Sequence, residues 1–293
     1  MTMLTDEQEN TVTQSLFGFG LGYSAQALGR LLTARHWSVG GTVRSPQRAE
    51  TLRTIGLKAH GFDALDPADI PPNCHWLISA PPDENGCPVF KQFGFHASSA
   101  KTITYLSTTG VYGDLHGGWA FEWTPVNPRS VRAERRVLAE EQWASTGQPF
   151  RTVRLPGIYG PGRSVFGRLR AGTARAIVKH GQVFSRVHVD DIASGLEAMM
   201  LRPDMTGVFH LCDDAPAPPH VVTEYAARLL GLDAPERVDF ATADLSDMAR
   251  SFYAECKRVS NARAKSALGW FPEYPTYKEG LSAVLAEEGH PPI

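Results

Sequence analysis

The chain has 293 residues, of which 42% are hydrophobic and 20% are charged, so it can bury the core of one large domain or of a domain with a small lobe. Its formal net charge of −2 gives no electrostatic basis for binding nucleic acid or an anionic membrane. No apolar run approaches the roughly 20 residues of a membrane-spanning helix, and the four cysteines have no CxxC or zinc spacing. We therefore expect a cytoplasmic protein with reduced thiols and no metal site. The polar segment 1–13 is unlike a signal peptide, and we expect it to be a disordered extension.

From residue 14 to about residue 155, short apolar runs alternate with helical patterns, which is typical of a parallel sheet covered on both faces. The predicted strands are Ser15–Phe19, Ser38–Val43, Lys58–Gly61, His75–Ser79, Ile103–Ser107 and Arg151–Leu155. The predicted helices between them are Gln26–Ala34, Pro46–Thr54, Pro88–Ala97 and, approximately, Ser130–Ser145. With right-handed crossovers, this order predicts a doubly wound α/β sheet of the Rossmann type.

The composition changes after residue 156, where glycine and proline interrupt the segment GIYGPGR. The elements predicted beyond it are a strand at Val187–Val189, a helix at Ile192–Met200 capped by Asp190 or Asp191, a strand at Val208–Cys212, a helix ending near Leu230, and helices near Asn261–Leu268 and Thr276–Leu285. We interpret residues 14–156 as a dinucleotide-binding domain. Residues 157–293 are interpreted as a small α/β substrate lobe that returns some elements to the Rossmann sheet.

A glycine-rich turn, GFGLGYSA at residues 18–25, follows the first predicted strand. Gly20, Gly22 and Ala25 form the pattern G-x-G-x-x-A, whereas a frame starting at residue 18 puts a tyrosine where helix and strand must pack closely. Gly20 permits the tight turn, Gly22 lets a pyrophosphate approach the backbone, and the following helix offers free N–H groups. The predicted cofactor contacts in this turn are Gly20, Gly22, Tyr23, Ser24 and Ala25.

The end of the second predicted strand indicates which dinucleotide is bound. NAD-binding proteins carry an Asp or Glu about 20 residues after the turn, where it bonds the ribose 2′-hydroxyl. This chain reads GTVRSPQRAE there, and Arg44 can pair with a 2′-phosphate, with Ser45 and Arg48 beside it. We therefore predict NADP as the cofactor, with NAD as the alternative. Further cofactor contacts are predicted at Asp63, Ser79, Ala80 and Pro81.

The glycine turn and the segments STTGVYGD, RLPGIYGPGR, RVHVDDIASG and SNARAKSALGW resemble the short-chain dehydrogenase/reductase superfamily, specifically its extended, NAD-dependent epimerase/dehydratase-like branch. The resemblance covers residues 15–285. It implies a Ser or Thr at the end of the fifth strand and, on the next helix, a Tyr followed four residues later by a Lys. In such sites the Lys and the oxidised nicotinamide lower the pKa of the tyrosine, so that its phenolate accepts a substrate proton.

Alignment on VYGD and on Glu140 places Thr108 at the first of these positions, but Arg132 and Arg136 at the positions of the Tyr and the Lys. No Tyr or Lys occurs between residues 113 and 157, so no shift of the helix restores the pair. Arginine is not a base at neutral pH and cannot replace the phenol. Arg136 remains a candidate contact of the nicotinamide ribose.

Thr108 and Tyr112 are the candidate catalytic residues that the sequence leaves near the expected cleft. On the substrate side, Arg163 and Arg186 are candidate ligands of an anion. The resemblance implies a diphosphate-binding arginine a few residues before HVDD, and Arg186 lies two residues beyond that position, on the same face of a strand.

These residues predict an NADP(H)-binding atypical short-chain dehydrogenase/reductase, an oxidoreductase or epimerase-like enzyme acting on an unknown small molecule. The alternative is a catalytically inactive NADP-binding sensor or scaffold protein, which the missing Tyr and Lys favour. Arg132 argues against a conventional sugar-nucleotide epimerase. The resemblance also suggests a homodimer that forms through the helix carrying RAERR.

Overall fold

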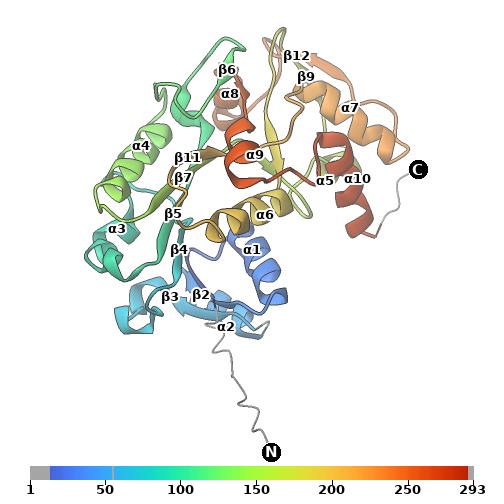
Figure 1. Cartoon of the computed structure of the whole chain (residues 1–293). Helices are drawn as coiled ribbons and strands as arrows, with labels where there is room; N and C mark the ends of the chain where they lie inside the picture. Colours follow the sequence, from blue (N-terminus) through green and yellow to red (C-terminus); the bar gives the residue numbers. More distant parts are fainter. Residues whose placement is uncertain (1–13, 55, 290–293) are drawn as a thin grey trace, which may run out of the picture.

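The computed structural model describes residues 14–54 and 56–289, so the extension predicted at residues 1–13 lies outside the described residues. Its centre is a seven-stranded parallel sheet in the order β11-β7-β5-β4-β1-β2-β3 (Figure 1). The strands are β1 (Ser15–Phe19), β2 (Ser38–Val43), β3 (Lys58–Gly61), β4 (His75–Ile78), β5 (Thr102–Thr108), β7 (Phe150–Leu155) and β11 (Gly207–His210). The strand order reverses between β1 and β4, and ligands of such sheets bind outside the carboxyl ends of the strands at this point. The doubly wound Rossmann fold is therefore confirmed.

Helices cover both faces of the sheet. On one face lie α1 (Tyr23–Ala34), α2 (Pro46–Thr54), α6 (Val189–Met200) and α9 (Ala262–Leu268), and on the other lie α3 (Pro88–Phe93) and α4 (Val131–Ala144) (Figure 1). Successive side chains of β4 point to opposite faces of the sheet. Leu77 packs in the core beneath the first set of helices, and Trp76 and Ile78 pack in the core beneath the second. Trp76 makes edge-to-face contacts with Phe19 and Trp143 at centroid distances of 5.0 and 6.4 Å.

One apolar core joins the two predicted parts of the chain. Leu28 and Leu32 of α1 belong to the same buried cluster as Leu196 and Met199 of α6, although α6 lies beyond residue 156. The strand β11 also follows residue 156 and completes the edge of the main sheet beside β7. The second part of the chain therefore supplies both a sheet strand and a helix to the Rossmann fold.

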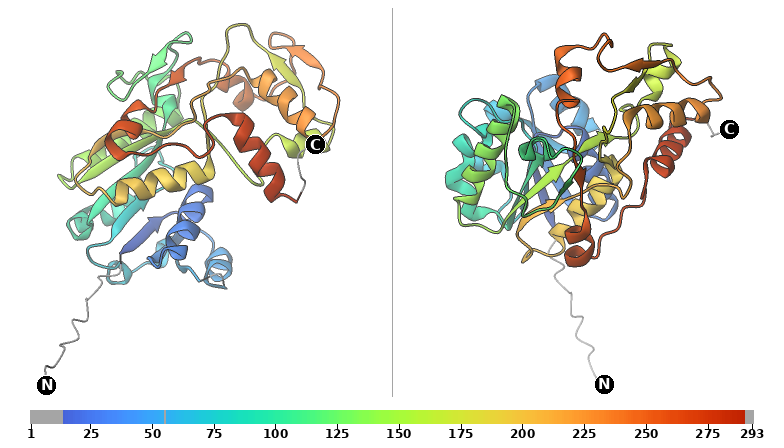
Figure 2. Two further views of the ribbon diagram at one scale, coloured as in Figure 1. Left: turned by 45° about the vertical axis from the view of Figure 1, so that its right-hand side comes forward. Right: turned by 90° about the horizontal axis from the view of Figure 1, so that it is seen from above.

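The remaining elements form a lobe at the carboxyl end of the sheet. They include three two-stranded parallel pairs: β8 (Gly157–Tyr159) with β10 (Arg186–His188), β9 (Ala176–Val178) with β12 (Arg237–Asp239), and β6 (Trp119–Ala120) with β13 (Arg258–Val259). The helices are α5 (Phe166–Arg170), α7 (Pro219–Leu229), α8 (Asp247–Phe252) and α10 (Tyr277–Glu287). Figure 2 shows α7 and α10 on the side of the molecule away from α3 and α4. None of the helices within the described ranges combines the length and apolar character that a bilayer crossing requires.

Several predicted boundaries differ from the structure. The first helix begins at Tyr23 rather than Gln26, because Gly22 in an extended conformation already serves as its N-cap. The helix predicted at residues 88–97 is two elements, since α3 ends at Phe93 and a 3-10 helix continues over Gly94–Ser99.

The predicted cap of α6 is wrong. The N-cap is His188, whose Nδ1 accepts a hydrogen bond from Asp190 N at 3.3 Å. Asp191 instead accepts bonds from the backbone N–H groups of Glu273 (2.6 Å) and Tyr274 (3.3 Å), and so ties α6 to the segment before α10. The carboxylate serves a long-range contact, which local capping preferences do not reveal.

The strands β1 and β2 approach each other through paired glycines. Gly18 and Gly41 lie opposite each other, and a Cβ built on Gly41 would be 2.2 Å from Gly18 O. No side chain fits this contact without moving a strand.

We predict that Gly41→Ala lowers the free energy of unfolding by about 3 kcal/mol, because overpacking must displace backbone rather than a flexible side chain. Gly167→Ala in α5 is the control, since a Cβ there meets nothing within 4 Å, and alanine favours a helix over glycine. Urea denaturation monitored by tryptophan fluorescence measures both. Equal stability of the two variants would contradict the close approach.

Candidate functional site

The glycine turn lies at the carboxyl end of β1, beside the reversal in strand order. Gly20 has φ +96°, and a Cβ there would lie 3.0 Å from both Ala80 N and Ser79 Oγ, so this position requires glycine. A Cβ on Gly22 would meet no atom closer than Gly20 O, at 4.0 Å. Within the described residues, this side of the turn is therefore open. Ala25, 1% exposed, packs beneath the turn.

The turn is held in place before any ligand binds. Gly20 N donates to Thr42 Oγ1 at 3.1 Å, Leu21 N donates to Thr42 O at 2.7 Å, and the Ser79 hydroxyl donates to Gly20 O. The first turn of α1 carries no acidic residue, so a phosphate would meet free N–H groups without a repelling carboxylate. The geometry fits the pyrophosphate of a dinucleotide.

The residues predicted to select NADP follow β2, the neighbour of the edge strand β3. Arg44 is exposed and directly follows β2. The hydroxyl of Ser45 accepts a hydrogen bond from Arg48 N at 3.3 Å and so supports the start of α2. Asp63 is exposed in the 3-10 helix that follows the neighbouring strand β3. Because β2 and β3 are adjacent and parallel, Arg44 and Asp63 stand at the same edge.

The end of β5 carries the surviving member of the predicted catalytic set. Thr108 is half-buried, and its Oγ1 accepts a hydrogen bond from Gly110 N at 3.1 Å, which leaves the hydroxyl proton to donate. Ser107, one residue earlier, faces the helices and donates to Glu140 Oε1 at 2.5 Å. The two neighbouring hydroxyls therefore have different roles.

The two arginines at the expected Tyr and Lys positions have different surroundings. Arg136 Nη1 donates to Leu106 O at 2.6 Å and to the Tyr105 hydroxyl at 3.1 Å, so this side chain is bonded to β5. Arg132 is exposed, and its guanidinium carbon lies 5.5 Å from the ring centre of Phe252 in α8. Neither arginine can exchange a proton at neutral pH.

Tyr112 lies in the core rather than at a surface. It is 0% exposed, accepts a hydrogen bond from Arg154 Nη1 at 2.9 Å, and lies 2.6 Å from His210 Nε2. His210 Nδ1 is 2.9 Å from Ser260 O, so Nδ1 carries the proton and Nε2 accepts from the tyrosine. Burial raises the pKa of Tyr112 to about 12 and lowers the pKa of His210 to about 4. A neutral histidine and a neutral phenol therefore share this bond.

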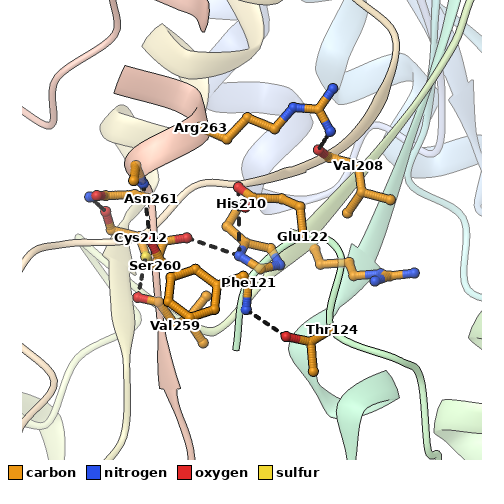
Figure 3. Close-up of polar contacts among 12 residues, drawn as sticks. Phe121, Glu122, Thr124, Val208, His210, Cys212, Val259, Ser260, Asn261 and Arg263 are labelled. Carbon is orange, nitrogen blue, oxygen red and sulfur yellow. Dashed lines mark hydrogen bonds and ion pairs between the residues drawn. The ribbon is translucent and has the colours of Figure 1, made fainter. Parts of the chain in front are cut away.

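Two buried carboxylates complete this network. Arg154 binds Glu140 through two bonds, with Nη2 to Oε2 at 2.7 Å and Nε to Oε1 at 3.2 Å. Glu122 is 7% exposed, its Oε1 lies 3.8 Å from His210 Nδ1, and burial raises its pKa. Figure 3 shows the side chain of Glu122 turned toward His210. Sequence analysis missed Glu122, because a single glutamate after a two-residue strand carries no pattern.

A second buried polar group surrounds Arg186 in β10. Arg186 Nη1 donates to Phe184 O at 2.8 Å and to Ala217 O at 3.1 Å. Asp213 is 2% exposed, burial raises its pKa to about 7, and its Oδ2 has no hydrogen-bond partner within the described residues. The Tyr159 hydroxyl likewise has no hydrogen-bond partner among the described residues. Two buried oxygens beside Arg186 therefore lack a hydrogen bond in the part of the chain that the structure describes.

The two arginines predicted for the substrate occupy different contacts. Arg163 is exposed, and its guanidinium carbon lies 5.7 Å from the ring centre of Tyr23 in the glycine turn. Arg186 is held by carbonyls of the lobe, as described above. Among the described residues, no group of three or more His, Cys, Asp or Glu side chains could hold a metal ion. All four cysteines are free.

Comparisons with known proteins agree with the fold. No family model matches the chain. Protein YeeZ of Escherichia coli K12 is 30% identical over 236 residues, covering 74% of this chain and 84% of that protein. The chain belongs to the YeeZ family. A putative NAD-dependent epimerase/dehydratase from Methylobacillus flagellatus has the same fold, with a TM-score of 0.70 at 22% identity over 96% of this chain and 100% of its own.

Other relatives of this YeeZ-family chain extend the comparison. A Streptomyces protein named 3-diazoavenalumate denitrifying reductase is 30% identical over 175 residues, covering 56% of this chain and 53% of that protein. A solved protein of unknown function from Silicibacter pomeroyi is 45% identical, with a TM-score of 0.89 over 94% of this chain and 99% of its own. Human epimerase family protein SDR39U1, solved with NADPH, has a TM-score of 0.74 at 17% identity, over 94% of this chain and 99% of its own. The two solved structures therefore share the fold of this chain.

The buried His210 predicts a pH dependence of stability. Its folded-state pKa of about 4 lies below the ordinary value of 6.5. Between about pH 4 and pH 6.5, His210 is therefore protonated in the unfolded chain and neutral in the folded protein. Stability therefore falls as the pH drops from about 6.5 to about 4. We predict that His210→Gln reduces this slope by about 1.4 kcal/mol per pH unit.

Urea denaturation at several pH values in this window measures the slope. His75 is also buried with a pKa lowered to about 3, so some slope remains in the variant. His96→Gln, at an exposed position, is the control and should keep the wild-type slope. An unchanged slope in His210→Gln would show that this histidine titrates normally in the folded protein.

Proposed function

We propose that the protein binds NADP(H) and acts as an oxidoreductase on a small polar molecule. The observation that carries this proposal is the preformed turn, in which Gly20 lies against Ala80 and the open side of Gly22 exposes the start of α1. Arg44 stands at the end of β2, where NAD-binding proteins carry a carboxylate. The human structural neighbour, solved with NADPH, supports the choice of cofactor.

The proposed cofactor contacts follow from these positions. The N–H groups at the start of α1 bind the pyrophosphate, and the guanidinium of Arg44 binds the 2′-phosphate. Asp63 bonds the adenine amine, and the segment 79–81 lines the nicotinamide ribose. Arg136 acts as a positioning residue, because its bonds to Leu106 O and the Tyr105 hydroxyl hold the end of β5 next to the cofactor.

The side chains at the nicotinamide end favour reduction over epimerisation. When bound, NADPH would supply a hydride, and water would supply the proton that completes the reduction. Thr108 donates a hydrogen bond to the acceptor, and the exposed guanidinium of Arg132 stabilises negative charge on it. An epimerase must also remove and return the proton of a substrate hydroxyl, and neither arginine does so. The Streptomyces relative is named a reductase, which supports the same class.

Arg186 is the proposed ligand of an anionic group on the substrate. Its Nη1 is fixed by two carbonyls of the lobe, so the rest of the guanidinium fork is oriented in advance. The unsatisfied oxygen of Asp213 lies in the same buried cluster and can accept a hydrogen bond from a hydroxyl of the same ligand. We infer a substrate that combines a negative charge with a hydroxyl.

A second candidate function is cofactor binding without turnover. Three observations favour it: Tyr112 is buried with its hydroxyl already bonded, Arg136 is bonded to β5, and Arg132 has no acid or base function. A protein with these features keeps the dinucleotide site and lacks the phenol. It would respond to the ratio of NADPH to NADP in the manner of a sensor or scaffold.

We predict that Arg44→Ala weakens NADPH binding by about 1–3 kcal/mol, the range for a lost charged hydrogen bond, and leaves NADH binding nearly unchanged. Titration calorimetry with both nucleotides measures the difference. Arg228→Ala, an exposed arginine on α7, is the control. Equal losses for NADPH and NADH would refute the role of Arg44.

We predict that NADPH is oxidised in the presence of a carboxylate-bearing ketone or enone, and that Thr108→Val lowers kcat about 100-fold with unchanged NADPH affinity. Tyr112→Phe should lower stability and keep turnover, because its hydroxyl serves the core. Absorbance at the NADPH band measures both. Binding without oxidation of any acceptor would favour the second candidate, and turnover abolished by Tyr112→Phe in a folded protein would make that phenol catalytic.

A further inference from the structure

A loop of the substrate lobe reaches the glycine turn. Tyr23, the first residue of α1, donates its hydroxyl hydrogen bond to Pro161 O at 2.9 Å across 138 positions of the chain. The guanidinium carbon of Arg163 lies 5.7 Å from the centre of the same ring. The tyrosine ring thus joins this loop to the helix whose N-terminus is the proposed pyrophosphate site.

The backbone of the loop is fixed on several sides. Gly160 and Arg163 exchange both backbone hydrogen bonds, at 3.2 and 2.9 Å. Gly162 N donates to Glu288 Oε1 at 3.3 Å. A Cβ on Gly160 would lie 2.5 Å from the Tyr23 hydroxyl oxygen, so the loop is in direct contact with the ring. Because the backbone is held in this way, the direction in which the Arg163 side chain leaves the loop is also constrained.

Arg163 retains its charge and its donors. None of the ion pairs within the described ranges includes it. Burial raises the pKa of Tyr23 to about 12, and the positive charge of Arg163 opposes this shift. The nearby carboxylates of Asp190 and Glu287 raise the pKa further. Neither carboxylate pairs with the arginine, whose guanidinium remains available to an anion.

We propose that Arg163 is a ligand of the dinucleotide pyrophosphate, contributed by the substrate lobe. The inference rests on the proposed NADP(H) site and deepens it. The first turn of α1 supplies N–H groups but no charged side chain, so a diphosphate bound there lacks a counter-charge from the helix. A guanidinium fork matches a phosphate and can supply this charge. Arg163 then serves the cofactor, rather than the substrate for which its sequence context suggested it.

The test uses ligands that contain or lack the pyrophosphate, so that the phosphates of the cofactor are probed separately. Arg163→Ala should weaken NADPH and NADH by the same factor, about tenfold, because both contain the pyrophosphate. Adenosine 2′-monophosphate, used as a competitor, lacks the pyrophosphate, so Arg163→Ala should leave its affinity unchanged while Arg44→Ala weakens it. Arg163→Lys should restore most of the binding, since it keeps the charge.

Arg168→Ala, at an exposed arginine of α5 in the same lobe, is the matched control and should change neither dinucleotide affinity. Thermal unfolding checks each variant, and Arg163→Gln replaces any alanine variant that does not fold. The proposal is overturned if Arg163→Ala matches this control, if only NADPH is weakened, or if the 2′-monophosphate is weakened equally. If the wild-type protein binds neither dinucleotide, the proposed function itself is refuted. This outcome is distinguishable because it is measured on the wild-type protein alone.

The Tyr23 contact gives a second, independent readout. Tyr23→Phe removes the hydrogen bond to Pro161 O that holds the loop against α1. We expect Tyr23→Phe to weaken NADPH binding in the wild-type background and to have no added effect in Arg163→Ala, because its influence runs through the arginine. Additive losses in the double variant would show that the tyrosine and the arginine act separately, which contradicts the proposed arrangement.

Discussion

The buried ion pair between Glu140 of α4 and Arg154 of β7 holds together the end of the sheet on which the candidate site stands. Arg154 also donates to Tyr112, and Ser107 of β5 donates to the same carboxylate. Removing either charge would leave the other buried and unpaired, at a cost of about 3–5 kcal/mol. Two strands, one helix and the turn after β5 are therefore fixed relative to one another by a single polar cluster.

This cluster explains what α4 does in the absence of the usual catalytic pair. In active superfamily members, the corresponding helix turns a phenol and an ammonium toward the cofactor. Here the inward polar groups of α4 are bonded to the sheet, Arg136 to a carbonyl of β5 and Glu140 to Arg154. These bonds hold α4 against β5 and β7.

The parts of the fold that the sequence predicts are those with local causes. The strands β1, β2 and β3 and the helix α2 match their predicted bounds, because glycine, proline and alternating apolar runs mark where they begin and end. The glycine turn is also local, since its constraint lies within a few residues and in the strand before it. The two-residue strands β6 and β13 are too short to show a period, and only their pairing defines them.

The polar clusters could not be predicted, because distant segments build them. Tyr112 reads as a loop residue until His210 and Arg154 surround it. The neighbours of Arg163 and Arg186 are likewise far away in the chain. Residue types at these positions indicate that a charge is present, whereas its role depends on which segment the fold brings next to it.

The shared core of α1 and α6 has a consequence for how a molecule enters the protein. Leu28 and Leu32 belong to the same buried cluster as Leu196 and Met199, so the helix after the glycine turn and a helix from beyond residue 156 form one close-packed unit. The two halves cannot swing apart about a hinge without exposing that core to water. A molecule that enters at the carboxyl end of the sheet therefore meets a rigid framework, and only displacements of surface loops can make room for it without opening that core.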